Sequence, residues 1–166
     1  MPHTLTRTTR SFLAGTFVAL ACCLTLVAAG TADGRVEVKN GVYFQAAKKP
    51  KQPQGFVTVN RGKVNSAFGA VIFRKPNGKK CVPQDYDLLE SNGRIQIAFA
   101  AKQPARPNRK NRFRITNAPQ SFQPGLKATV TGKFLSPKRA TITINAKVKT
   151  CTAKLTLKNA VFTAGG

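Results

Sequence analysis

Three carboxylates lie close together in one short stretch of the sequence, at Asp85, Asp87 and Glu90. Two such carboxylates can act as acid and base in glycoside cleavage, and several of them can supply oxygen ligands to a calcium ion. The same residues could also form an acidic patch beside a turn, where they attract neighbouring lysines. We favour the acidic patch and keep metal binding and catalysis as alternatives.

Other catalytic side chains are scarce. The single histidine, His3, lies in an N-terminal segment that we expect to be removed. Without histidine no Ser-His or Cys-His pair can form, because no side chain with a pKa near 7 is present to take the proton. A Ser-Lys arrangement stays formally possible, but no spacing singles one out. We therefore expect a protein that is not an enzyme and that needs no cofactor.

A basic segment from Lys102 to Arg114 is the main candidate for a binding site. It contains no acid, and Pro104 and Pro107 keep it from closing into regular structure. Arginines in such a segment could form paired hydrogen bonds with phosphate or sulfate groups. A solvated basic loop with no dedicated site is the simpler interpretation and the one that we slightly favour. The candidate anion-binding residues are Lys102, Arg106, Arg109, Lys110, Arg112 and Arg114.

The N-terminus has the features of a secretory signal peptide. Arg7 and Arg10 precede an apolar run, and small residues follow it. This order of charged, apolar and small residues predicts a signal peptide over residues 1–29, with cleavage after Ala29 or Ala32. A retained membrane anchor is the alternative. Residues 30–166 then form one exported β-domain, either secreted or associated with the cell envelope.

The net charge gives the clearest indication of a partner. Losing Arg7 and Arg10 with the signal lowers the formal charge from +23 to +21. Such a charge attracts polyanions in a strongly salt-dependent way, although it also favours solubility. The expected partner is an anionic polymer or surface: a cell-wall polymer, anionic lipid headgroups or extracellular nucleic acid.

Two cysteines, Cys81 and Cys151, remain after the predicted signal is removed. In an exported domain two cysteines are typical of one disulfide, with two free thiols as the alternative. A zinc site is not expected, because two cysteines without a histidine provide at most half of its ligands.

The last third of the chain alternates apolar and polar residues in three runs, Leu126–Phe134, Ala140–Val148 and Cys151–Leu157. Period 2 predicts β-strands with one buried face. The opposite face would form a basic surface that could follow an anionic polymer. We favour a different role for its lysines, which is to prevent pairing between exposed strand edges. They are Lys127, Lys133, Lys147, Lys149, Lys154 and Lys158.

Shorter patterns predict strands in the rest of the chain. They cover Arg35–Lys39, Val42–Ala47, Gly55–Val59, Lys63–Arg74, Ile95–Phe99 and Phe113–Ile115. Within the fourth, Val64, Phe68, Ala70 and Ile72 are expected to share one face. The fold class is therefore all-β: an antiparallel meander of about 8–10 strands closed as a β-barrel or β-sandwich, preceded by a cleaved signal-peptide helix.

Several short motifs resemble a group of small secreted all-β proteins from high-GC actinobacterial-type bacteria. The motifs are Gly41-Val42-Tyr43, Phe56–Val59, Gly62-Lys63-Val64, Cys81, Val130–Phe134, Ala140 with Ile142, and Cys151. The chain departs from the group at Phe162-Thr163-Ala164, where a tryptophan-type aromatic is common, and in lacking a glycine just before Ile142. The resemblance implies an all-β fold and no assigned activity.

Three hypotheses for function follow, in order of preference. The first is a non-enzymatic exported β-domain that associates electrostatically with anionic material. The second is a small-ligand carrier, if the strands enclose an open apolar interior. The third is a hydrolase that uses Asp85, Asp87 or Glu90. A sugar-binding platform is not expected, because the chain has no tryptophan, two tyrosines, and phenylalanines that mostly belong to the apolar face.

Overall fold

The computed structural model describes residues 34–47, 49, 52–86, 90–91 and 93–164. The predicted signal peptide and both predicted cleavage sites lie outside these residues. Within the described part of the chain, no helix is long and apolar enough to cross a membrane.

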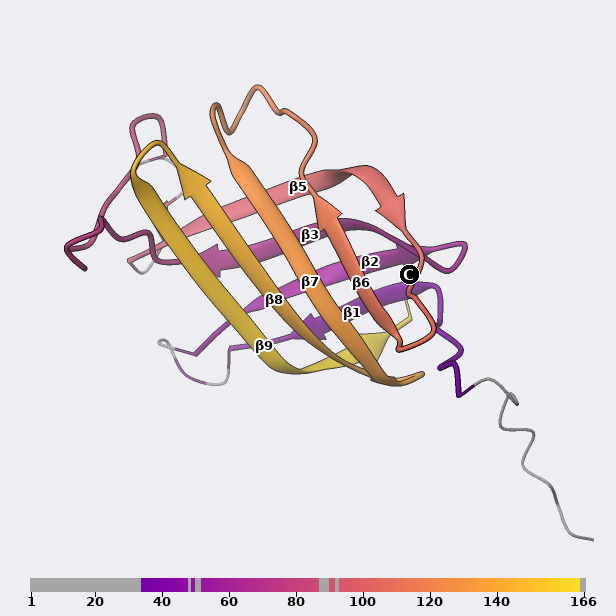
Figure 1. Ribbon diagram of the computed structural model, residues 1–166. Helices are drawn as coiled ribbons and strands as arrows, with labels where there is room; N and C mark the ends of the chain where they lie inside the picture. Colours follow the sequence, from indigo (N-terminus) through magenta and orange to yellow (C-terminus); the bar gives the residue numbers. More distant parts are fainter. Residues whose placement is uncertain (1–33, 48, 50–51, 87–89, 92, 165–166) are drawn as a thin grey trace, which may run out of the picture.

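The described residues form one antiparallel sheet in the order β4-β5-β3-β2-β1-β9-β8-β7-β6. The all-β prediction is confirmed. β4 has only two residues, and the other eight strands wind into a nearly closed, barrel-like sheet in which β9 pairs with β1. Figure 1 shows β6–β9 crossing over a second layer made of β1, β2, β3 and β5. The strands are β1 Gly41–Gln45, β2 Gly55–Asn60, β3 Lys63–Val71, β4 Glu90–Ser91, β5 Arg94–Ala105, β6 Arg112–Thr116, β7 Lys127–Ser136, β8 Arg139–Val148 and β9 Cys151–Thr163.

The remaining gap in the barrel lies between β5 and β6. One isolated bridge, Ala101 to Asn117, spans it. Beyond this bridge, glutamines from the β6–β7 loop replace the missing strand. Gln123 is only 2% exposed; its amide nitrogen donates to the Gln96 carbonyl oxygen at 3.0 Å, and its amide oxygen accepts from the Ala98 N–H at 3.4 Å. The loop therefore satisfies backbone groups at an edge that would otherwise be open to pairing.

Gln120 extends this arrangement. In the amide orientation that the hydrogen-bond network favours, its nitrogen donates to the Ala98 carbonyl oxygen at 2.7 Å and its oxygen accepts from the Ala100 N–H at 3.1 Å. Two glutamine side chains thus act in place of a strand backbone along β5.

The two layers pack directly against each other. A Cβ atom added to Gly69 on β3 would lie 2.8 Å from Leu155 and 2.9 Å from Ile144 on the opposite layer. The inward side chains of the strands are buried around this contact, including Tyr43, whose hydroxyl donates to the Pro137 carbonyl oxygen at 2.9 Å. The middle of the barrel is therefore filled by side chains, which counts against the open interior that a carrier would need.

The sequence-based face assignment for β3 is wrong in part. Val64 points inward, but Phe68, Ala70 and Ile72 lie on the outer side, where Phe68 and Ile72 are partly buried and Ala70 is buried. Ala67, Val71 and the neighbouring residue Phe73 are buried on the inner side. The register of β3 shifts against both of its partner strands near Val64. Because side chains alternate with period 2, one such shift moves every later residue to the other face.

Two further predictions about strands differ from the structure. Residues 35–39 are not a strand. This segment is instead held at one end of the barrel, where the Val36 N–H donates to the Asn111 side-chain oxygen at 2.8 Å. In addition, β5 continues to Ala105 through part of the basic segment that was expected to be a loop.

Candidate anion-binding groove

The start of β9 is tied to the segment that follows β3. Cys81 and Cys151 form the expected disulfide, with their Cα atoms 6.1 Å apart. Nearby, the Arg74 N–H donates to the Thr152 carbonyl oxygen at 2.8 Å, and the Thr152 N–H donates to the Arg74 carbonyl oxygen at 2.9 Å. Arg74 therefore pairs with β9 in the way that a residue of a neighbouring antiparallel strand would.

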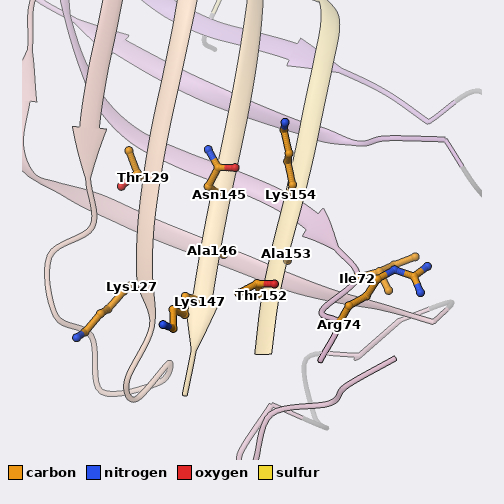
Figure 2. Close-up of a pocket in the computed structure, with 10 residues that line it drawn as sticks. All are labelled: Ile72, Arg74, Lys127, Thr129, Asn145, Ala146, Lys147, Thr152, Ala153 and Lys154. Atoms are coloured by element: carbon orange, nitrogen blue, oxygen red, sulfur yellow. The ribbon is translucent and has the colours of Figure 1, made fainter. Parts of the chain in front are cut away.

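An open groove of about 650 Å³ follows the outer surface of β7, β8 and β9 and reaches Arg74 (Figure 2). Figure 2 shows Lys127 and Lys147 near the same end of the barrel, where β7 begins and β8 ends, while Lys154 points away from them. Two rows of cross-strand partners line the groove: Lys127, Lys147, Thr152 and Arg74 in the first, and Thr129, Asn145 and Lys154 in the second.

The charges in this groove are of one sign. Lys127 and Lys147 are direct partners on adjacent strands, which are about 5 Å apart in any sheet. Like charges in directly opposite positions destabilise a sheet, and no acid lines the groove to offset them. At its edge the Arg74 guanidinium is held by a hydrogen bond to the Gly78 carbonyl oxygen at 2.8 Å. The groove is therefore suited to an anion that lies between the cations and accepts hydrogen bonds from the threonine hydroxyls and the Asn145 amide.

Basic and hydroxyl side chains also occupy the neighbouring cross-strand rows. We use the term basic face for the outward residues of β6, β7 and β8 and of β9 as far as Lys158. Residues 91–166 contain fifteen lysines and arginines and no aspartate or glutamate. The basic face therefore has no acid from its own strands. Its further rows are Arg112, Lys133 and Thr141, then Arg114, Thr131, Thr143 and Thr156. The six lysines predicted to point outward are all exposed.

The structure separates the six basic residues predicted from the segment between Lys102 and Arg114. Lys102 lines a groove beside the β6–β7 loop. Arg106 lies at one end of the barrel, in a pocket that Arg61 also lines. Arg112 lines a third groove, together with Lys133 on the basic face. The segment thus does not form one site. The other three, Arg109, Lys110 and Arg114, are exposed.

The structure describes only part of the predicted acidic cluster of Asp85, Asp87 and Glu90. Asp85 is exposed and has a left-handed backbone, with φ of 69°. Asp87 and the side chain of Glu90 lie outside the described residues. In the part of the chain that the structure describes, no three potential metal ligands come together.

Sequence reasoning missed a second surface on the opposite layer. Three rows of outward residues cross β1, β2, β3, β5 and the end of β9, and none of their side chains is charged. We call this surface the uncharged face. Its rows are Thr163, Val42, Thr58, Ser66 and Ala100; Val161, Phe44, Phe56, Phe68 and Ala98; and Gln54, Ala70 and Gln96.

Three phenylalanines are therefore on the outer surface, contrary to the expectation that phenylalanines mostly belong to the buried face. Phe44, Phe56 and Phe68 are partly buried, and the last two rings are stacked, with centroids 5.2 Å apart and 18° between their planes. The sequence indicated this surface only weakly, because each phenylalanine lies in a short apolar run. Which residues of such a run point inward depends on the register with the paired strands.

The fold and these two surfaces define an all-β protein with a nearly closed, filled barrel-like sheet, one basic outer face and one uncharged outer face. No family model matches the chain, and neither a curated protein nor a solved structure matches it. The resemblance to small secreted actinobacterial-type proteins stays a prediction.

Proposed function

We propose that the chain is a non-enzymatic, exported β-domain that binds anionic polymers through the basic face, with the groove between Lys127 and Arg74 as its centre. The observation that supports this most is the direct pairing of Lys127 with Lys147 in a groove without an acid. This arrangement costs stability in the free protein, and a bound anion would remove the cost.

An extended ligand fits this surface better than a small anion. The groove is open and shallow, and its cations are spread over two rows rather than gathered around one point. Neighbouring positions are about 5 Å apart across the strands and about 7 Å apart along them. A polymer with a negative charge on each repeat can meet several of these positions at once, so its affinity increases with every charge that is neutralised.

The shared chemistry of the candidate polymers is a chain of phosphate or carboxylate groups. Cell-wall polymer, anionic lipid headgroups and extracellular nucleic acid all present such groups. Lysines on the outer surface of the barrel contact phosphate charge rather than base edges, so binding to nucleic acid should not depend on sequence.

The test is a binding titration with a phosphate polymer, such as single-stranded DNA, over a series of salt concentrations. We expect the logarithm of the affinity to fall linearly with the logarithm of salt concentration, by roughly 0.7–0.9 for each neutralised phosphate. The double variant Lys127→Gln/Lys147→Gln should reduce this slope by about two such steps. Wild-type binding that is weak at low salt, or insensitive to salt, would contradict the proposal.

Lys63→Gln is the matched control, because Lys63 is exposed on β3, outside the basic face. For each charge removed, it should change the slope by less than the Lys127→Gln/Lys147→Gln variant does. An equal effect would mean that the net charge alone attracts the polymer and that the groove is not its centre. Parallel titrations with a carboxylate polymer and with anionic vesicles would identify the preferred class.

The other two hypotheses gain no support from a specific observation. The contact of Gly69 with Leu155 and Ile144 leaves no open space between the layers for a carried ligand at that point. The hydrolase hypothesis stays a prediction that substitution of all three acids by alanine would test.

A further inference from the structure

The uncharged face has a feature that the basic face lacks, a continuous apolar row across five strands. Val161, Phe44, Phe56, Phe68 and Ala98 are successive cross-strand partners on β9, β1, β2, β3 and β5. Val161 is 49% exposed, and beyond Ala98 the loop residue Phe122 is 56% exposed and lines the same shallow groove as Phe56 and Phe68. Phe44, Phe56 and Phe68 between them are partly buried, so the row is a contiguous apolar strip that reaches solvent, which is a feature of interaction sites.

The row has a symmetric order. Phe56 is at its centre, a phenylalanine lies on either side, and a smaller apolar residue lies at each end. A two-fold axis through Phe56 would place Phe44 of one copy against Phe68 of the other, and Val161 against Ala98. Such a self-complementary surface is what a two-fold dimer interface requires, because each contact occurs twice.

Charge also favours a second copy on this face. Two molecules of this chain, each with a formal charge of +23, repel one another wherever their basic surfaces meet. The three rows of the uncharged face contain no charge, and the next outward residues on β5 at either end are the cations Arg94 and Lys102. Arg139 on β8, the cross-strand partner of Val161, is a further cation at the border of the face. Two copies that meet through its uncharged rows avoid the repulsion that contact between their basic faces would produce.

The geometry of the rings makes a sugar ligand a poorer fit. The Phe56 and Phe68 rings are stacked on each other, so each covers one face of its neighbour. A sugar needs an open ring face for its C–H groups.

We propose that two copies of this chain form a reversible dimer through the uncharged face, with Phe56 at the two-fold axis. The two rows of five residues span about 19 Å across the strands, the third row spans about 10 Å, and the three rows together span about 14 Å along the strands. This patch is smaller than the roughly 800 Å² per partner of a standard interface. The dimer is therefore weak, and its population depends on protein concentration. The inference is independent of the proposed polymer binding.

The test is sedimentation velocity on the purified protein over a range of protein and salt concentrations. Salt screens repulsion between the two copies, so the dimer fraction is expected to rise with salt. Binding to a phosphate polymer falls with salt, and this opposite sign separates the two proposals. A molecule that stays monomeric at every salt concentration, up to about 1 mM protein, overturns the dimer.

Two substitutions locate the interface. Val161→Lys adds a charge at an exposed position, so it should leave folding intact and decrease dimer association at least tenfold. Phe56→Ser, at the proposed two-fold axis, should also leave folding intact and decrease dimer association at least tenfold. Leu135→Ser is the control, because Leu135 is 50% exposed on β7 and lies outside the uncharged face. A dimer that neither Val161→Lys nor Phe56→Ser weakens overturns the inference. A monomer that binds vesicles of phosphatidylcholine, a zwitterionic lipid without net charge, also overturns it, in favour of a lipid surface.

Discussion

Lys127 on β7 and Lys147 on β8 are direct cross-strand partners on the outer surface of the barrel. The row continues through Thr152 to Arg74, so the cations are followed by a hydroxyl and a guanidinium rather than by an acid. Repulsion within this row and the proposed affinity for an anion would have the same origin, so the effects of a substitution on stability and on binding should differ in sign.

Replacing Lys147 by glutamine should therefore have opposite effects on stability and on binding. The free energy of unfolding should rise by a few tenths of a kcal/mol at low salt, because a like-charge pair is removed. The affinity for a phosphate polymer should fall at the same salt concentration. Urea denaturation and a binding titration measure the two effects. The gain in stability should vanish at about 1 M salt, where the repulsion is screened. Lower stability for Lys147→Gln at low salt would contradict this account.

The disulfide should contribute substantially to stability. Cys81 and Cys151 are 70 residues apart in the sequence, and closing a loop of this length restricts the unfolded chain. The Cys81→Ser/Cys151→Ser variant is expected to lose about 4 kcal/mol in the free energy of unfolding, as measured in urea. Because the bond lies near the backbone pairing of Arg74 with Thr152, the variant should also bind a polymer less tightly. The wild-type protein under reducing conditions is the control and should match the variant.

Gln123 should be essential for closing the barrel. Gln123→Ala would remove the partners of the Ala98 N–H and the Gln96 carbonyl oxygen, at a cost of about 1–3 kcal/mol. The exposed β5 edge should then favour aggregation, which light scattering would detect on heating. Gln96→Ala is the matched control, because the Gln96 backbone rather than its exposed side chain accepts the hydrogen bond. Equal stability of Gln123→Ala and the wild-type protein would show that the loop does not seal the barrel.

Two buried tyrosines should limit stability at high pH. Burial raises the pKa of Tyr86 to about 12, and burial likewise raises the pKa of Tyr43 although a backbone hydrogen bond from Lys39 opposes it. The unfolded chain loses these protons near pH 10, whereas the folded chain keeps them. The contribution to stability is thus complete below about pH 10 and is lost as the pH rises towards about 12. The tyrosinate absorbance should follow unfolding in this window.

Tyr86→Phe provides the control for this pH dependence. It keeps the ring contact with Phe73, whose centroid lies 6.3 Å away, and removes the ionisable hydroxyl. Unfolding of the variant at alkaline pH should therefore begin at a higher pH than in the wild-type protein. An unchanged alkaline transition would mean that Tyr86 does not contribute to it.

Local sequence pattern was sufficient for much of the fold. The alternation in the last three runs predicted β7, β8 and β9, because side chains in a strand reach one buried face at every second residue. The pairing of Cys81 with Cys151 followed from their being the two cysteines outside the predicted signal peptide. The same reasoning failed for Phe68, because a register shift depends on the partner strand and leaves no mark in the alternation itself.

The sequence by itself determined the strand content, the disulfide and the excess of positive charge, all of which depend on residue type and short-range spacing. Only the tertiary structure decided where that charge lies. It placed Arg74 beside Thr152, divided the segment from Lys102 to Arg114 among separate surfaces, and aligned Phe44, Phe56 and Phe68 on a face without charge. The physical reason is that register between strands distant in sequence sets which side chains become neighbours, and register depends on packing across the whole barrel.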